Sequence, residues 1–587
     1  MDKTEIVSLL EKIAALLALK ADSNVYEVRA YENAARTLNG LSGDIQQLLA
    51  ENKLKGLPGL GTTLLKRIEE AVQAGHSAFY DELVANTPQV KLDMLRISGL
   101  GPKRINTIYD QLHVNSIAEL EQACKDDRVA HIPGFGKKTQ DKIVQGIAFL
   151  HQHADRHLYP IAEEEAERIR AALAERPEII RLQVAGSLRR RRETVKDIDI
   201  VASVADDSSS EVRRAVMDFF TSLPSVKAIT GQGETKSSVI LNSGIALDLR
   251  VVGDSHFPYT LHHFTGSREH HIPLRRRALS MNMTINDYGL FAVENGQQRL
   301  IPCTTEADIY AALGMDYIEP ELREDMGEIE AAAQHTLPVL IQYSDLRGVL
   351  HAHSTWSDGQ NTIRAMAEAC IAHGYTYLGI TDHSKVASYA GGLDEDALQR
   401  QSEEIEKLNA EFAGRFHILK GTECDILRDG TLDFSDAALA SLDFVVASIH
   451  SNFNLTREEQ TQRMLRAIEN PYVDIIGHPT GRILLGRPGY DLDIEAVIDA
   501  AAQHGVCIEI NAHPSRLDLD WHWLRKARDK GIKIPIDPDA HALAGIDDMR
   551  YGIGIARKGW LRASDVLNTL EYEALRAYLD VRKGRRR

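Results

Sequence analysis

The chain has 587 residues, of which 43% are hydrophobic, enough for several ordered domains that each bury a core. No apolar run approaches the roughly 18 residues that a membrane span needs, and the N-terminus has an amphipathic pattern unlike a secretion signal, so we expect a cytoplasmic protein without a membrane partner. The five cysteines form no Cys-x-x-Cys pair, which argues against disulfides and thiolate zinc sites. A net charge of −17 excludes a broadly basic surface, so any nucleic-acid contact must be local.

A hydrophobic-x-Gly-x-Gly pattern followed by an apolar-periodic helix occurs three times in the first 150 residues. Its glycine pairs are Gly59 and Gly61, Gly99 and Gly101, and Gly134 and Gly136. One such turn could be only a tight helical connection. Three indicate helix-hairpin-helix units, in which glycines let the backbone approach a phosphate and the next helix presents its N–H groups. We expect a small helical DNA-binding domain over residues 1–80 and helical fingers over 81–150, which position DNA without reading its sequence.

Two acidic strands follow in an α/β domain expected over residues 151–255. Alternation along Asp197-Ile198-Asp199 puts both carboxylates on one face, and a second strand offers Asp248 between apolar neighbours. A solvated acidic strand is the plainer interpretation. Three converging carboxylates instead suit two Mg²⁺ ions about 3.5–4 Å apart, the arrangement that stabilises both oxygens of an in-line phosphoryl displacement. We therefore assign Asp197, Asp199 and Asp248 as metal ligands and catalytic residues.

A Gly-Ser turn and an arginine run precede these strands. Gly186 and Ser187 can bring a backbone N–H and a hydroxyl to a phosphate, and Arg190 in the following run can neutralise a triphosphate. Together with the carboxylates, this order of residues indicates nucleotidyl transfer.

These segments resemble the palm of a family X DNA polymerase. The resemblance continues through Thr265-Gly266-Ser267 into a thumb expected over residues 256–320, followed by a linker over 321–345. It implies that the chain uses deoxynucleoside triphosphates on DNA with gaps or 3′ ends, as a monomer in DNA repair. The nucleotide-binding residues that it implies are Gly186, Ser187, Arg190, Phe264, Gly266, Ser267, His271 and Arg275.

The chain departs from the family in the first helical domain. Arg67 stands where related eukaryotic enzymes carry the lysine that forms a Schiff base with 5′-deoxyribose phosphate, and arginine cannot lose its proton to attack a carbonyl. We therefore leave the lyase activity open. Tyr31 matches a 5′-phosphate contact of the family, so recognition of a gap can persist without the lyase.

From residue 346 onward, short apolar strands alternate with helical segments, and each strand ends in a polar cluster. The clusters are 27 to 40 residues apart, the period of a βα unit, and seven of them predict a closed (β/α)7 barrel with one site on its top face. A lone histidine is usually structural, but six at strand ends favour metal binding. The candidate ligands are His351, His353, Asp358, His383, Glu423, His450, His478, Asp539 and His541.

Nine nitrogen and oxygen ligands suffice for two or three ions, and they suit Mn²⁺ or Zn²⁺. The same positions resemble the PHP (polymerase and histidinol phosphatase) domain, here over residues 346–587. The resemblance implies a metal-dependent 3′→5′ exonuclease and 3′-end processing activity, with cleavage at abasic sites as a further possibility of the family. The whole chain thus resembles the bacterial family X DNA polymerases that carry a C-terminal PHP domain.

Two other interpretations compete with a polymerase that also trims ends. The polymerase half could serve only to hold DNA for a nuclease or phosphatase, although a passive module has no need for three clustered aspartates. The barrel could hydrolyse a small phosphate ester, although three helix-hairpin-helix turns argue against that.

Overall fold

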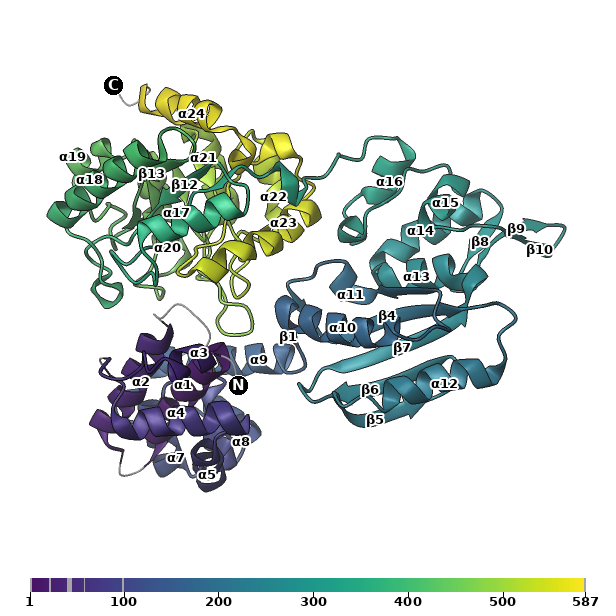
Figure 1. The fold of residues 1–587 in the computed structure, drawn as a ribbon, viewed down its shortest axis with the longest axis horizontal. Coiled ribbons are helices and arrows are strands. Elements are labelled where there is room, and N and C mark those ends of the chain that lie inside the picture. The colour runs from purple at the N-terminus through teal and green to yellow at the C-terminus, as the bar shows by residue number, and fades with distance from the viewer. Residues whose placement is uncertain (1–2, 21–22, 40–44, 58, 98–99, 585–587) are drawn as a thin grey trace.

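The computed structural model describes residues 3–20, 23–39, 45–57, 59–97 and 100–584. In Figure 1 the N-terminal helices lie at the lower left, the C-terminal domain above them, and the palm and thumb to the right of both. One hydrophobic cluster is continuous between the palm and the C-terminal domain, and the rings of Tyr159 and Tyr551 meet edge to face across this junction. Palm and C-terminal domain are therefore packed neighbours, although the thumb separates them in sequence.

The N-terminal helices share one hydrophobic core, which runs from Ile6 to Ile147. This core crosses residue 80, where the sequence suggested a boundary, so the two helical parts pack as one body. Its helices are α1 (Lys3–Leu19), α2 (Val25–Asn39), α3 (Ile45–Ala50), α4 (Thr62–Ala74), α5 (Ala78–Asn86), α6 (Gln89–Leu95), α7 (Pro102–Leu112), α8 (Ile117–Lys125) and α9 (Lys137–His153).

The palm is a five-stranded sheet with strand order β2-β4-β7-β6-β5. β4 alternates as the sequence predicts: Ile198 and Ile200 are buried, whereas Asp197 is exposed and Asp199 half-buried. β4 and β7 are parallel and the other neighbours antiparallel. The elements are β1 (His157–Leu158), α10 (Tyr159–Ala174), β2 (Arg181–Val184), α11 (Gly186–Arg189), β3 (Thr194–Val195), β4 (Asp197–Val204), α12 (Ser210–Thr221), β5 (Val226–Gln232), β6 (Lys236–Leu241), β7 (Ala246–Gly253) and η1 (Asp254–His256).

The thumb packs four α-helices and a three-stranded antiparallel sheet around its own core. Part of the expected linker belongs to this core: Leu322, Ile329 and Ala332 are buried in it, and the Arg323 side chain is fully buried in an ion pair with Glu306. The thumb elements are α13 (Phe257–Thr265), α14 (Arg268–Ser280), β8 (Met283–Ile285), β9 (Leu290–Glu294), β10 (Gln297–Ile301), α15 (Glu306–Ala312), η2 (Pro320–Leu322) and α16 (Glu328–Ala333).

The C-terminal domain is a ring of parallel strands, with helices between successive strands. The ring consists of three short sheets, β11-β12-β13, β14-β15-β16-β17 and β18-β19. These nine segments make seven strands, because β13 and β14 are parts of one strand and β17 and β18 are parts of another. Parallel bridges from His383 to Glu423 and from Ala352 to Ala540 join the pieces, so the ring closes as a seven-stranded barrel. The closed barrel brings the polar groups at the strand ends toward one point.

The strands of the barrel are β11 (Gly348–Val349), β12 (Tyr377–Ile380), β13 (His417–Lys420), β14 (Glu423–Asp425), β15 (Val446–Ser448), β16 (Ile475–Ile476), β17 (Cys507–Ile508), β18 (Ile510–Asn511) and β19 (Ile536–Asp537). Its α-helices are α17 (Ile363–Ala372), α18 (Glu395–Phe412), α19 (Asp436–Ser441), α20 (Arg457–Glu469), α21 (Ile494–His504), α22 (Trp521–Asp529), α23 (Met549–Lys558) and α24 (Tyr572–Gly584). Short 3-10 helices are η3 (Tyr343–Asp345), η4 (Ser388–Ala390), η5 (Leu543–Asp548), η6 (Ala563–Asp565) and η7 (Leu567–Thr569).

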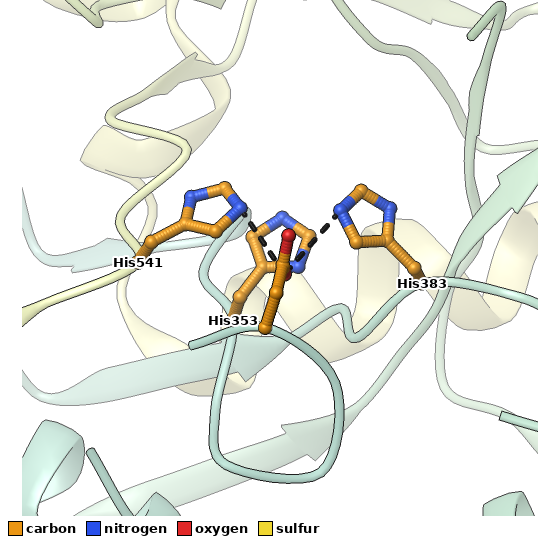
Figure 2. Close-up of side chains that lie close together, drawn as sticks. His353, His383 and His541 are labelled. Carbon is orange, nitrogen blue, oxygen red and sulfur yellow. Dashed lines mark ion pairs between the residues drawn. The ribbon is translucent and has the colours of Figure 1, made fainter. Parts of the chain in front are cut away.

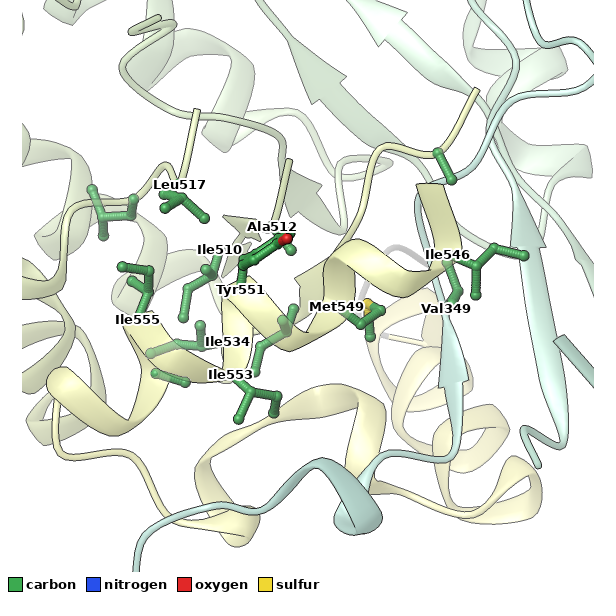
Figure 3. Close-up of a cluster of buried hydrophobic side chains, with 14 of the residues drawn as sticks. Val349, Ile510, Ala512, Leu517, Ile534, Ile546, Met549, Tyr551, Ile553 and Ile555 are labelled. Atoms are coloured by element: carbon green, nitrogen blue, oxygen red, sulfur yellow. The ribbon is translucent and has the colours of Figure 1, made fainter. Parts of the chain in front are cut away.

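Helix α23 closes the side of the barrel that faces the palm. Met549, Ile553 and Ile555 on this helix pack with Ile510 and Ile534 of the barrel wall (Figure 3). Gly552 allows the close approach, since a Cβ there would lie 2.7 Å from the Cβ of Ala512. None of the helices in the described residues is long and apolar enough to cross a membrane.

Candidate active sites

The strand register brings two of the three palm carboxylates together. Asp199 on β4 pairs directly with Asp248 on the parallel strand β7, and Asp197 lies two residues before Asp199 on the same face. Burial, together with the charges of Asp197 and Asp248, raises the pKa of Asp199 to about 6. A divalent cation would relieve this repulsion, so the donor set fits Mg²⁺.

Other groups already contact two of these carboxylates. Lys236 Nζ lies 2.6 Å from Asp248 Oδ2, and the Ser238 hydroxyl donates to Asp248 Oδ1 at 2.6 Å. Gly186 has a φ of +64°, and a Cβ there would lie 2.4 Å from Asp199 Oδ2. A side chain at residue 186 would therefore displace this carboxylate, which explains the need for glycine in the turn.

A pocket of about 630 Å³ opens beside these residues. Eight of the residues predicted from the sequence line it, namely Gly186, Ser187, Arg190, Asp197, Asp199, Phe264, Gly266 and Ser267. Ten further residues that the sequence analysis did not assign to the nucleotide site also line it, among them Arg156, Arg192, Arg268, Trp521 and His522. Arg192 could have been found in the arginine run after Ser187, whereas Trp521 and His522 come from the barrel and carry no local signal.

Two acceptor groups of the protein hold Arg190 in place. Its Nε donates to Glu324 Oε1 at 3.1 Å and its Nη1 donates to the Thr265 carbonyl at 2.8 Å. Glu324 lies in the segment expected to be a linker, which therefore contributes to the pocket.

Two predicted nucleotide residues do not line this pocket. His271 is buried behind the turn, where its Nε2 lies 2.8 Å from the His263 carbonyl, and Arg275 is exposed farther along α14. A Cβ at Gly266 would lie 2.9 Å from His271 Nε2, so His271 supports the turn from behind. Burial lowers the pKa of His271 to about 3, which keeps the imidazole neutral.

All nine predicted barrel ligands converge at the top of the barrel. Three groups have ligand atoms within 4.8 Å of one another: His353, Asp358, His383 and His541; His351, His353 and Asp539; and His383, Glu423 and His450. The ninth residue, His478, places Nε2 2.9 Å from Glu423 Oε1. Figure 2 shows the imidazoles of His353, His383 and His541 turned toward one another.

A second layer of carboxylates orients these imidazoles. His351 Nδ1 lies 2.6 Å from Glu509 Oε1, and His450 Nδ1 lies 3.3 Å from Asp425 Oδ1. Such contacts fix which nitrogen faces a metal. The sequence analysis missed Asp425, although its position two residues after Glu423 on one strand was a usable signal.

The donor set of the barrel fits metal ions. In the described part of the chain, three buried imidazole nitrogens make no hydrogen bond, namely His351 Nε2, His353 Nδ1 and His478 Nδ1, whereas His383 Nδ1 and Glu423 Oε2 lie 2.8 Å apart. Burying such atoms without partners costs about 1–3 kcal/mol each. Burial and the neighbouring imidazoles lower the pKa of His353 to about 3, so this ring is neutral, as a ligand must be.

The helix-hairpin-helix turns leave three helix N-termini open. Among the described residues, α4, α7 and α9 begin after Gly61, Gly101 and Gly136 without a side-chain cap. By contrast, Ser77 and Ser116 cap α5 and α8. Gly59, Gly134 and Gly136 have positive φ, as these turns require, whereas the predicted Gly99 lies outside the described residues. The uncapped N–H groups suit phosphate oxygens.

The lyase position is packed into the N-terminal domain. The Arg67 guanidinium stacks 3.5 Å from the Phe79 ring centre and donates to the Tyr31 hydroxyl. Tyr31 is only 2% exposed, so its hydroxyl is committed to Arg67 and a direct phosphate contact would need this contact to open. Lys66 points to solvent and pairs with Glu70.

Comparisons with known proteins agree with this arrangement. Residues 1–77 match the family described as Helix-hairpin-helix domain, and residues 91–148 match the SAM-like Helix-hairpin-helix tandem. Residues 260–324 match the DNA polymerase beta thumb, and residues 350–513 match the PHP domain. The thumb match ends within the segment 321–345, in accord with the packing of Arg323.

Relatives extend the match to nearly the whole chain. The chain is 40% identical over 581 residues to the protein named DNA polymerase/3′-5′ exonuclease PolX of Bacillus subtilis (strain 168). The alignment covers 99% of both chains. A probable phosphatase of Thermoanaerobacter sp. (strain X514) is 32% identical over 246 residues, or 40% of this chain and 94% of the relative. The chain therefore belongs to the bacterial family X DNA polymerases that carry a C-terminal PHP domain.

Proposed function

We propose that this chain is a template-directed DNA polymerase that fills short gaps and trims 3′ ends in its barrel. The pairing of Asp199 with Asp248 beside a pocket lined by Gly186, Ser187 and Arg190 carries the polymerase part. A chain that only held DNA would not need these carboxylates to converge, so this observation favours an active palm over a passive one.

In the palm, Asp197, Asp199 and Asp248 would hold two Mg²⁺ ions. When bound, the ions supply Lewis-acid stabilisation of the attacking and leaving oxygens. The Ser187 hydroxyl and the Arg190 guanidinium would bind the triphosphate, and the Asp248 carboxylate would accept the proton of the primer 3′-hydroxyl. The uncapped N-termini of α4, α7 and α9 would position gapped DNA through its phosphates.

In the barrel, the nine convergent ligands would hold two or three Mn²⁺ or Zn²⁺ ions. When bound, these ions would supply a nucleophile and neutralise charge on the transferring phosphoryl group. Glu509 and Asp425 would keep His351 and His450 oriented toward the metals. We assign 3′→5′ exonuclease and 3′-end processing to this site, with abasic-site cleavage as a further activity to be assayed.

Primer extension and primer shortening on one gapped substrate test both parts. We expect Asp199→Asn to lose extension and keep shortening, and His353→Ala to do the reverse. Shortening without extension in the wild-type protein would leave the palm as a DNA holder. Hydrolysis of a small phosphate ester without DNA degradation would make the barrel a phosphatase.

A further inference from the structure

Two domains line the pocket beside Asp197 and Asp199. Trp521 and His522, at the start of α22 in the barrel, line it together with Arg192 of the palm. The Arg192 guanidinium lies 5.7 Å from the Trp521 ring centre, and Trp521 is 3% exposed. The barrel therefore forms a wall of the pocket that we assign to the nucleotide.

Glu324 stands at the centre of this junction and contacts three cations. Lys558 Nζ of the barrel lies 2.5 Å from its Oε1, Arg190 Nε lies 3.1 Å from the same oxygen, and Arg192 Nη1 lies 3.5 Å from Oε2. Burial opposes ionisation of this carboxyl, but the three positive charges prevail and lower the pKa of Glu324. Glu324 is thus an anion that holds two of the palm arginines that line the pocket.

Lys558 is the third cation and cannot leave this position easily. It is 1% exposed, its Nζ donates to the Arg190 carbonyl at 3.1 Å, and it lies 4.7 Å from the Trp521 ring centre. A buried ammonium that lost its carboxylate partner would be strongly destabilised. Lys558 therefore stays with Glu324 when the arginines move.

Glu324 and a triphosphate compete for the same arginines. Both are anionic and both suit the guanidinium fork. If Glu324 lost its lysine, its charge would be balanced by Arg190 and Arg192 alone, and a phosphate would have to remove them against that attraction. With Lys558 present, the carboxylate remains paired after the arginines turn to the phosphate.

We propose that the barrel domain completes the nucleotide site of the palm. Lys558 compensates Glu324 so that Arg190 and Arg192 can bind the triphosphate, while Trp521 and His522 form one wall of the pocket. Lys558 acts through Glu324 and is a positioning residue. This inference rests on the proposed polymerase function and adds a dependence of nucleotide binding on the barrel.

Binding of dATP with Mg²⁺, measured by calorimetry on the full chain with gapped DNA, tests the inference. We expect Lys558→Met to weaken binding about tenfold, equal to about 1.4 kcal/mol, and the double variant Lys558→Met/Glu324→Gln to restore most of it. If the Lys558–Glu324 ion pair only holds the two domains together, the double variant should bind dATP as weakly as Lys558→Met, because it also lacks the ion pair. Weak binding in both variants would therefore overturn the compensation.

A matched control and a second variant complete the design. Lys530 pairs with Asp499 on the barrel surface, so Lys530→Met removes the same charge and should leave dATP binding unchanged. His522 is exposed, so His522→Ala should fold whatever happens to Lys558→Met, and it should weaken dATP binding. Unchanged dATP binding by the His522→Ala protein would contradict the claim that the barrel forms one wall of the nucleotide pocket.

Failure of the proposed function has a different signature. A wild-type chain that neither binds dATP nor extends a primer would refute the polymerase itself. A wild-type chain that does both, with Lys558→Met and His522→Ala equal to it, would refute only the dependence on the barrel.

Discussion

Asp199 lies directly opposite Asp248 across the parallel strands β4 and β7, and Gly186 approaches Asp199 so closely that a Cβ would collide with its carboxylate. The register of two strands and one positive-φ turn thus assemble the acidic centre. Parallel pairing is what brings residues almost 50 positions apart to neighbouring points, because the side chains of paired residues lie on the same face of the sheet.

We expect Asp248→Ala to lower primer extension by about 10²-fold or more, because a metal ligand that contributes several kcal/mol of charge stabilisation is lost. DNA affinity should stay nearly constant, since the N-terminal helices provide the positioning. Steady-state extension and an equilibrium DNA-binding assay on the same gapped duplex would measure both quantities. Lys236→Met is the variant to compare with Asp248→Ala, because it removes the cation that contacts Asp248 but leaves all three carboxylate ligands in place. Normal extension by the Asp248→Ala protein would show that Asp248 is not a catalytic metal ligand.

His353 occurs in two of the three barrel groups, so its loss should disturb more than one metal. We expect His353→Ala to reduce primer shortening by about 10–100-fold and to lower the metal content, while extension persists. Metal content is measured by elemental analysis of the purified protein. His373, which pairs with Asp547 and belongs to none of these groups, offers a control: His373→Ala should retain metal and shortening. If the His353→Ala protein folded and bound DNA but no longer extended the primer, the two active sites would depend on each other, which contradicts the model of two independent sites.

The glycine turns can be tested without disturbing the fold at one of them. Gly101 has a negative φ of −81°, and no described atom lies within 4 Å of a Cβ built there, so Gly101→Val should fold. If the turn contacts phosphate through backbone N–H groups, Gly101→Val should weaken DNA binding about tenfold and equally on unrelated sequences. Binding isotherms on two duplexes of different composition would decide it. Sequence-dependent loss would contradict backbone recognition. Gly136→Val is less informative, because a φ of +93° adds about 1–3 kcal/mol of strain.

Sequence periodicity predicted the local elements, but it did not predict how the domains pack against each other. Alternation in β4 and the recurrence of strand-end polar residues predicted the acidic strand and the barrel ligands, since both signals are local. Glu324 and Trp521 gave no such signal, because their role depends on the docking of the barrel against the palm. The segment 321–345 looked like a linker for the same reason: its acidic residues are surface-like in sequence, yet Arg323 and Glu328 are buried against partners in the thumb.

Arg67 offers a chemical test of the N-terminal domain. The guanidinium is stacked on Phe79 and bound to Tyr31, and it does not act as an amine nucleophile. We therefore expect no adduct at Arg67 when the protein is reduced with borohydride on incised abasic DNA. Mass mapping of the trapped peptide would show whether Lys66, which is exposed, reacts in its place. Arg67→Lys is the gain-of-function variant: an adduct at residue 67 in this variant alone would support a lost lyase.

The thumb should lose stability in mild acid because it buries three neighbouring histidines. Burial lowers the pKa of His262 and His270, and it lowers that of His271 to about 3. His270 keeps a lowered pKa even though Glu328 lies 2.6 Å from its Nδ1 and opposes the shift. In the unfolded chain a histidine titrates near 6.5. The folded pKa is therefore the lower one, and the stabilisation is complete above about pH 6.5 and is lost as the pH falls toward the folded values, because only the unfolded chain binds the proton.

Each such histidine contributes a slope of about 1.4 kcal/mol per pH unit below about pH 6.5. The His271→Asn variant lacks one of the three titrating groups. Between pH 7.5 and 5 we expect its free energy of unfolding to fall by about 1–2 kcal/mol less than that of the wild type. Calorimetric unfolding of the full chain, followed for the transition that contains the thumb, measures this difference. His335→Asn, at an exposed histidine of the same domain that pairs with Asp316, is the control for the removal of an imidazole. A His271→Asn profile parallel to wild type would mean that His271 binds its proton at the same pH in the folded and the unfolded chain, which would contradict a neutral imidazole behind Gly266 in mild acid.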